Sequence, residues 1–149
     1  MIFRPHYFIL LLLLIQMSAA NPLESDALDR FRWEHRILLI STQEPLSGSL
    51  LDELNQASGP IRERHLLWFL FSGEDVVTNY PGILEEKFEK ALRHFYRNRS
   101  HSKHSVLLIG KDGGIKARQS RLDLKALFNR IDSMPMRQRE MREQDGPGG

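Results

Sequence analysis

Two unbroken apolar runs decide the fold class: Ile37-Leu38-Leu39-Ile40 and Leu66-Leu67-Trp68-Phe69-Leu70-Phe71. Each is apolar at every position, which is typical of a strand covered on both faces of its sheet. Between them, residues 46–57 place apolar side chains along one helix face, and Gly59-Pro60 is expected to end that helix. A strand, a helix and a second strand predict a right-handed crossover between two parallel strands.

The same patterns predict the rest of the chain. They indicate, in order along the sequence, a first helix over 23–33, a later helix over 84–97, a strand over 106–109, an Asp-Gly turn at 111–114, an edge strand over 115–118 and a last helix over 124–131. The fold class is therefore α/β: a mixed four-stranded sheet flanked by helices on both faces, in the order (α)-β-α-β-α-β-β-α. We expect the domain to occupy residues 21–136, and the charged, glycine-ended segment 137–149 to be a disordered tail.

Composition excludes several classes of protein. The chain has 149 residues, a length that suits one domain. It contains no cysteine, which excludes disulfides, thiolate zinc sites and thiol chemistry. Its net charge is only +2, whereas a dedicated nucleic-acid binder carries a strongly basic field. We therefore expect no specific nucleic-acid binding.

Residues 1–20 have the pattern of a secretory signal peptide. Arg4 precedes the apolar run Tyr7–Ile15, and the small residues Ser18 and Ala20 suit cleavage after Ala20. An uncleaved membrane anchor is the alternative, but the run is about half the roughly 20 residues that cross a bilayer as a helix. We expect an exported protein, periplasmic or secreted, with no membrane anchor after cleavage.

Four short segments add a more specific signal than the order of elements. They are Trp33-Glu34-His35-Arg36, Arg62-Glu63-Arg64, Ile109-Gly110-Lys111-Asp112-Gly113-Gly114-Ile115-Lys116, and Ile131-Asp132-Ser133-Met134-Pro135-Met136-Arg137. With them, the chain resembles an exported thioredoxin-like family of unknown function, numbered 4174 among such domains, whose domain also occurs in sushi-repeat-containing extracellular proteins and in equarin. The resemblance implies a thioredoxin-like fold and little about activity.

The chain departs from a redox thioredoxin where the reactive sulfur belongs. The loop after the first strand reads Ser41-Thr42-Gln43-Glu44-Pro45, without a thiolate at the start of the following helix. The stretch before the third strand, Ser102–Ser105, lacks the proline that faces such a site. We therefore expect no thiol oxidoreductase or peroxidase activity, and no cofactor.

A basic segment is the first candidate site. Arg93, Arg97, Arg99 and Lys103 gather near a predicted helix end, where they are candidates to contact an anion such as a polysaccharide carboxylate or a lipid headgroup. The alternative is a solvated helix end, because the helix dipole favours cations there. The histidines of this segment, residues 94, 101 and 104, match no metal-binding signature, so we predict no metal site.

Met134, Met136 and Arg137 form the second candidate. Methionines around a proline give an adaptable apolar surface next to a charge, which suits docking of a partner. We favour the other interpretation, in which the methionines pack under the sheet and Pro135 ends the preceding helix.

Three functions remain open from the sequence. The preferred one is a non-enzymatic binding or structural module whose partner is an extracytoplasmic protein or a polyanion. The second is a polyanion- or membrane-surface binder that acts through the basic segment, and the third is an enzyme with cysteine-independent chemistry. No catalytic residue is assigned, because no motif brings a nucleophile, a base and an acid together.

Overall fold

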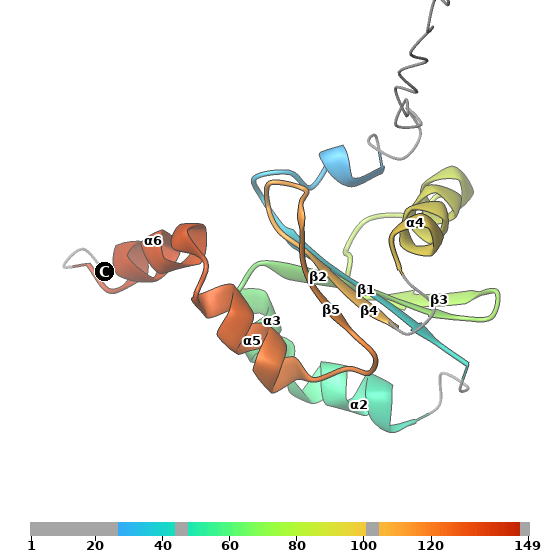
Figure 1. The fold of residues 1–149 in the computed structure, drawn as a ribbon, viewed down its shortest axis with the longest axis horizontal. Helices are drawn as coiled ribbons and strands as arrows, with labels where there is room; N and C mark the ends of the chain where they lie inside the picture. The colour runs from blue at the N-terminus through green and yellow to red at the C-terminus, as the bar shows by residue number, and fades with distance from the viewer. Residues whose placement is uncertain (1–26, 44–47, 101–104, 147–149) are drawn as a thin grey trace, which may run out of the picture.

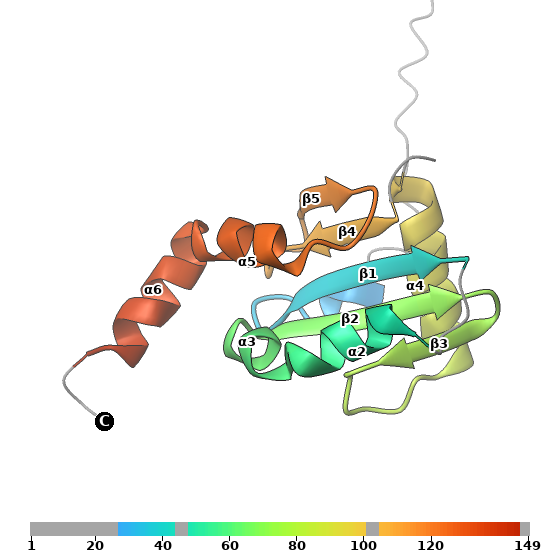
Figure 2. The same cartoon turned by 90° about the horizontal axis from the view of Figure 1, so that it is seen from below.

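The computed structural model describes residues 27–43, 48–100 and 105–146. Its centre is a five-stranded mixed sheet in the order β3-β2-β1-β4-β5 (Figures 1 and 2). The strands are β1 (Arg36–Thr42), β2 (Leu66–Ser72), β3 (Asp75–Thr78), β4 (Val106–Ile109) and β5 (Ile115–Gln119). The helices are α2 (Ser49–Gln56), α3 (Ser58–Glu63), α4 (Glu86–Arg99), α5 (Leu124–Asp132) and α6 (Pro135–Gln144).

The two apolar runs form the parallel centre of this sheet, as predicted. β1 pairs with β2 in parallel, from Arg36 against Leu66 to Thr42 against Ser72. β4 pairs with β1 antiparallel, and the Asp-Gly turn joins β4 to an antiparallel β5. The prediction of an α/β fold with helices on both faces is confirmed.

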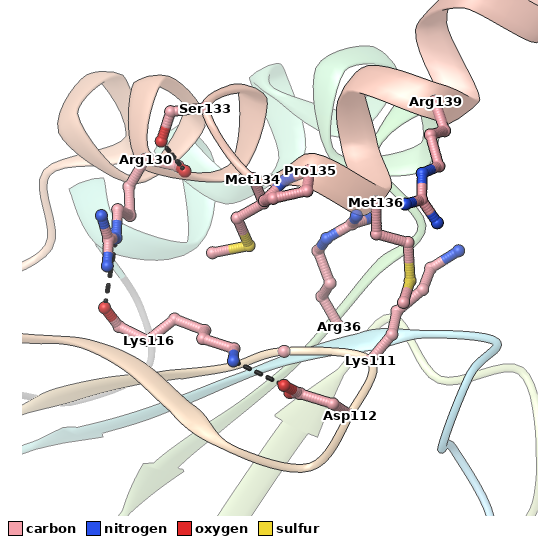
Figure 3. A pocket seen from close by; sticks show the side chains of 11 residues that line it. Arg36, Lys111, Asp112, Lys116, Arg130, Ser133, Met134, Pro135, Met136 and Arg139 are labelled. Carbon is pink, nitrogen blue, oxygen red and sulfur yellow. Dashed lines mark hydrogen bonds and ion pairs between the residues drawn. The ribbon is translucent and has the colours of Figure 1, made fainter.

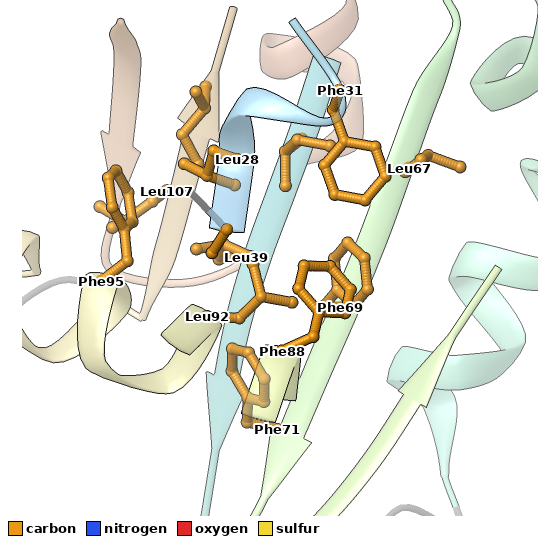
Figure 4. Packing of buried hydrophobic residues seen from close by; sticks show 13 residues of the cluster. Leu28, Phe31, Leu39, Leu67, Phe69, Phe71, Phe88, Leu92, Phe95 and Leu107 are labelled. Carbon is orange, nitrogen blue, oxygen red and sulfur yellow. The ribbon is translucent and has the colours of Figure 1, made fainter. Parts of the chain in front are cut away.

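Side chains alternate between two cores along each central strand. Leu39, Phe69 and Leu107 face one core, which α4 and the helical turn at 27–29 cover (Figure 4). Leu38, Trp68 and Leu108 face the other, which α2, α3 and α5 cover. Because both faces of the sheet are buried, every side chain of the two apolar runs packs into one of the two cores.

The structure corrects the predicted strand number from four to five. β3 pairs antiparallel with the end of β2 through a tight turn at Gly73, whose φ is +56°. The strand is only four residues long and none of its residues is buried, so it leaves no apolar run in the sequence. Its residues also precede the turn-rich stretch 79–82, which masks the strand pattern.

The helices also differ from prediction in three places. Of the helix expected over 23–33, the described residues form only a helical turn at 27–29, followed by turns over 30–34. The Gly59-Pro60 pair does not end the helical region, because α3 includes both residues and Pro60 stands in its first turn, where a missing N–H is tolerated. The segment from Arg137 is not a tail: Pro135 starts α6, which continues to Gln144. Residues 1–20 lie outside the described part of the chain, and no helix within that part is long and apolar enough to cross a membrane.

Candidate functional site

A buried ion-pair cluster lies at the end of the sheet where β1 and β2 begin. Arg36, the first residue of β1, is 1% exposed, and Lys111, after β4, is 7% exposed. Both contact the carboxylate of Glu140 in α6: Arg36 Nη1 donates to Oε2 at 3.1 Å, Arg36 Nη2 to Oε1 at 3.3 Å, and Lys111 Nζ lies 2.7 Å from Oε1. A carboxylate held by a guanidinium fork and an ammonium is a charge-assisted arrangement of the stronger kind.

A second group of ion pairs continues the cluster through α5 and α3. Arg137 is 1% exposed and donates to Asp132 at 3.4 Å and to Glu63 at 3.1 Å. Arg64 donates to the other oxygen of Asp132 at 2.6 Å. Charges this deeply buried are tolerated only when they are paired, and here α6 supplies Arg137 and Glu140 to partners on the body of the domain.

Two residues with left-handed backbone conformations precede these strands. Trp33 has φ +67° and His65 has φ +49°, an uncommon region for residues other than glycine. The backbone N–H of Trp33 donates to the carbonyl of Lys111 at 2.7 Å, and Lys111 Nζ donates to Nδ1 of His65 at 2.8 Å. The strained residues are therefore tied directly to the ion-pair cluster.

Beside the cluster, between the α5–α6 junction and the β4–β5 turn, is a cavity of about 390 Å³ (Figure 3). We call it the basic cavity. Its lining residues are Arg36, Gly110, Lys111, Asp112, Lys116, Arg130, Ser133, Met134, Pro135, Met136 and Arg139. Five of these side chains are cationic and one is acidic, and its volume lies within the range of small-molecule sites.

The charges of the basic cavity are unequally satisfied. Lys116 Nζ donates to Asp112 at 2.6 Å, so the one lining carboxylate is already paired. With the described residues, the guanidinium of Arg130 makes only a long contact, from Nε to the carbonyl of Lys116 at 3.4 Å. Arg139 is exposed and makes no hydrogen bond or ion pair with any described residue. The cavity therefore carries an excess of positive charge, which favours an anion.

The acids and the histidine here titrate away from their ordinary values. Burial by itself would raise the pKa of Glu140, but hydrogen bonds from Lys111 and Arg36 outweigh it and leave that pKa lowered. The hydrogen bond from Lys116 lowers the pKa of Asp112. Burial, followed by the charge of Lys111, lowers the pKa of His65. At neutral pH both acids are ionised and His65 is neutral.

The basic segment that the sequence singled out does not form one free cationic surface. The guanidinium of Arg93 donates to Glu89 and to the carbonyls of Gly73, Glu74 and Asp75, and it stacks over Phe71. Arg93 therefore fastens α4 to the β2–β3 turn.

The other members of that segment have different surroundings. Arg99 stacks over Phe95, and Arg97 is exposed and lines a second cavity of about 380 Å³ with Ser41, Phe71 and Tyr96. Lys103, His101 and His104 lie outside the described residues. Among those described, no three histidine, aspartate or glutamate side chains gather as a metal site would require.

The second predicted group is brought to the basic cavity. Met134 and Met136 line it and are partly buried, and Met134 also packs against the core under α5. Arg137 points into the ion-pair cluster and is not available to a partner. Pro135 does end α5, and it also begins α6.

Sequence reasoning missed Arg36, Lys111 and Glu140. Arg36 and Lys111 flank apolar strands, where a cation looks like an ordinary solvent-exposed end. Glu140 lies in the segment taken for a tail. The available signal was that all four segments carrying the family resemblance contain charged residues, and the structure brings these segments together around the ion-pair cluster and the basic cavity.

The chain matches a protein-family model over most of its length. A family model described as "Domain of unknown function (DUF4174)" matches residues 27–140, which includes every residue from the first helical turn to Glu140. No solved structure matches the chain. Because the match covers most of its length, the chain belongs to this family of domains of unknown function.

Proposed function

We propose that this domain is a non-enzymatic binding module that takes a small anionic ligand into the basic cavity. One observation carries the proposal: five cationic side chains line one cavity, and two of them, Arg130 and Arg139, hold no carboxylate of the described residues, whereas Arg36 and Lys111 share Glu140 and Lys116 holds Asp112. The guanidinium groups of these two arginines can offer fork donors to phosphate, sulfate or carboxylate oxygens.

The position of the basic cavity supports a binding role that is separate from redox chemistry. The elements follow the order expected of a thioredoxin-like scaffold once β3 is set aside. A thiol site on that scaffold would follow β1, whereas the basic cavity lies at the opposite end, beside Arg36 where β1 begins. We infer that a thioredoxin-like scaffold without cysteine serves here as a rigid frame for binding.

The setting we propose for this module is outside the cytoplasm. The support is the signal-peptide pattern of residues 1–20. Fractionation of cells that express the full chain, with mass determination of the exported form, tests this location. The expected mass is that of a chain that begins at Asn21.

A second candidate function is polyanion binding on α4. Arg97 favours it, because it is exposed beside the second cavity. Arg93 weighs against it, because its donors are occupied by Glu89 and three carbonyls. The basic cavity is therefore the better supported site.

Titration calorimetry of the purified protein with inorganic phosphate and with sulfate tests the proposal. We expect binding that weakens as sodium chloride is raised, and a loss of at least tenfold in the double variant Arg130→Gln/Arg139→Gln. The matched control is Arg121→Gln/Arg142→Gln, which removes the same charge from two exposed positions outside the cavity.

Each alternative has its own result. If Arg97→Gln/Arg99→Gln abolishes anion binding while the cavity variant retains it, the site is on α4. If no anion binds at low salt, or if the control variant loses as much affinity as the cavity variant, the proposal is wrong.

A further inference from the structure

The lining of the basic cavity is divided between charge and apolar surface. Met134, Pro135 and Met136 form one part, at the α5–α6 junction. Figure 3 shows the side chains of both methionines directed from the helices toward the hairpin that carries Lys111 and Lys116. Thioethers are flexible and polarizable and adapt to apolar groups of varied shape, so this wall suits a hydrocarbon segment more than a bare inorganic ion.

The cavity is open to solvent, so its volume indicates how much of a ligand it covers. A space of about 390 Å³ corresponds to about a dozen water molecules at the volume each occupies in the liquid. A phosphate group uses about five non-hydrogen atoms of that space, which leaves room for a chain of roughly six to eight carbons.

We propose that the ligand of the basic cavity is an amphiphilic organic anion with one strongly acidic head group and a short apolar segment. The head group lies at Lys116 and Arg130, which stand side by side at one end of the cavity, and the apolar segment lies on Met134 and Met136 (Figure 3). This inference rests on the proposed function and specifies the ligand class of the same site.

A series of n-alkyl phosphates, from ethyl to octyl and below their micelle concentrations, tests the inference by calorimetry. We expect the dissociation constant to fall about fourfold per added methylene, the value for burial of one CH₂, until the cavity is filled. n-Alkylammonium ions of the same lengths are the head-group control, and they are expected not to bind.

Variants separate the two parts of the site. Met136→Gln is expected to reduce the gain to less than twofold per methylene while affinity for inorganic phosphate changes little. Met134→Gln is a second variant of the same kind, and Met141→Gln, outside the lining on the same helix, is the control. Arg130→Gln is expected to weaken every alkyl phosphate by the same factor and leave the dependence on chain length unchanged.

The outcomes distinguish this inference from the function on which it rests. If inorganic phosphate binds as tightly as hexyl phosphate, the inference is wrong and anion binding stands. If no anion binds, both are wrong. A lipid headgroup offers similar chemistry, so phosphatidylglycerol vesicles form a separate arm; binding to vesicles without binding to the soluble alkyl phosphates would overturn the inference.

Discussion

Arg36 and Glu140, 104 positions apart in the sequence, form a two-pronged ion pair that fastens α6 to the start of β1. The guanidinium is 1% exposed and the carboxylate side chain 14%. Arg137 is the only buried residue of α6, so ion pairs, and not an apolar stripe, hold this helix in place. Figures 1 and 2 show α6 projecting from the body beyond α5, which fits a helix attached chiefly at its first two turns.

Removing the charge of Glu140 is expected to destabilise the domain strongly. The Glu140→Gln variant leaves Arg36 and Lys111 buried without their shared counter-ion. Loss of one partner of a buried pair costs about 3–5 kcal/mol of the free energy of unfolding. Urea denaturation at pH 7 measures this cost. Glu143→Gln, an exposed position on the same helix, is the control and is expected to cost less than about 0.5 kcal/mol. Equal effects in the two variants would contradict a structural role for Glu140.

Stability is expected to fall with acid in two stages. The folded-state pKa of His65 lies below its ordinary value of 6.5, so the unfolded chain binds the proton first and stability declines as the pH falls below 6.5. The folded-state pKa of Glu140 lies below 4.5, so its contribution is complete above pH 4.5 and is lost as the pH falls through the folded value. Besides Glu140, the charged or titratable groups that act on His65 are Arg36, Lys111 and His35.

Urea denaturation between pH 7.5 and pH 3 separates the two stages. His65→Asn is expected to remove the upper one, because asparagine tolerates the left-handed φ of this position. Glu140→Gln is expected to remove the lower one and to keep the upper one. If stability rises between pH 6.5 and pH 5, the sign of the His65 contribution is wrong.

Truncation distinguishes a folded helix from a tail. A chain that ends at Met136 lacks both Arg137 and Glu140, so Asp132 and Arg36 each lose a partner. We expect this chain to be destabilised by several kcal/mol, or to fail to fold. A chain that ends at Gln144 keeps every ion pair of α6 and is expected to keep nearly full stability. Thermal unfolding of the two chains, side by side, gives the measurement; similar melting temperatures would restore the tail interpretation.

The parts of the fold that follow from local pattern could be predicted from the sequence. Continuous apolar runs identify β1, β2 and β4, since a strand buried on both faces has no polar alternation. The Asp-Gly pair identifies the β4–β5 turn. α6 could not be predicted, because it has no apolar face and its attachment depends on partners such as Glu63 and Arg36, far away in the sequence.

Only some residues of the candidate site could be predicted from the sequence. Met134 and Met136 stood out because methionines around a proline are unusual, and they do line the basic cavity. Lys111 looked like an ordinary turn residue, and its burial arises only when α6 brings Glu140 over the hairpin. A buried charge leaves no local signature, since only its tertiary neighbours make burial tolerable.

The missed strand β3 offers a last prediction, at Asn79. Just after the strand, the Asn79 side chain continues the pairing that the backbone of β3 no longer provides: Oδ1 accepts from the N–H of Trp68 at 2.7 Å, and Nδ2 donates to the carbonyl of Leu66 at 3.1 Å. Asn79→Ala leaves both backbone groups without these partners and is expected to cost about 1–2 kcal/mol in urea denaturation. Asn79→Asp keeps the acceptor for the N–H of Trp68 but loses the donor to the carbonyl of Leu66, so a smaller loss than that of Asn79→Ala is expected. Asn55→Ala, exposed on α2, is the control and is expected to be neutral or slightly stabilising, because alanine is the better helix former.

Hydrogen exchange at the Trp68 amide gives an independent readout: it should accelerate in Asn79→Ala and not in Asn55→Ala. Unchanged protection at Trp68 would mean that the side chain of Asn79 does not substitute for a strand partner.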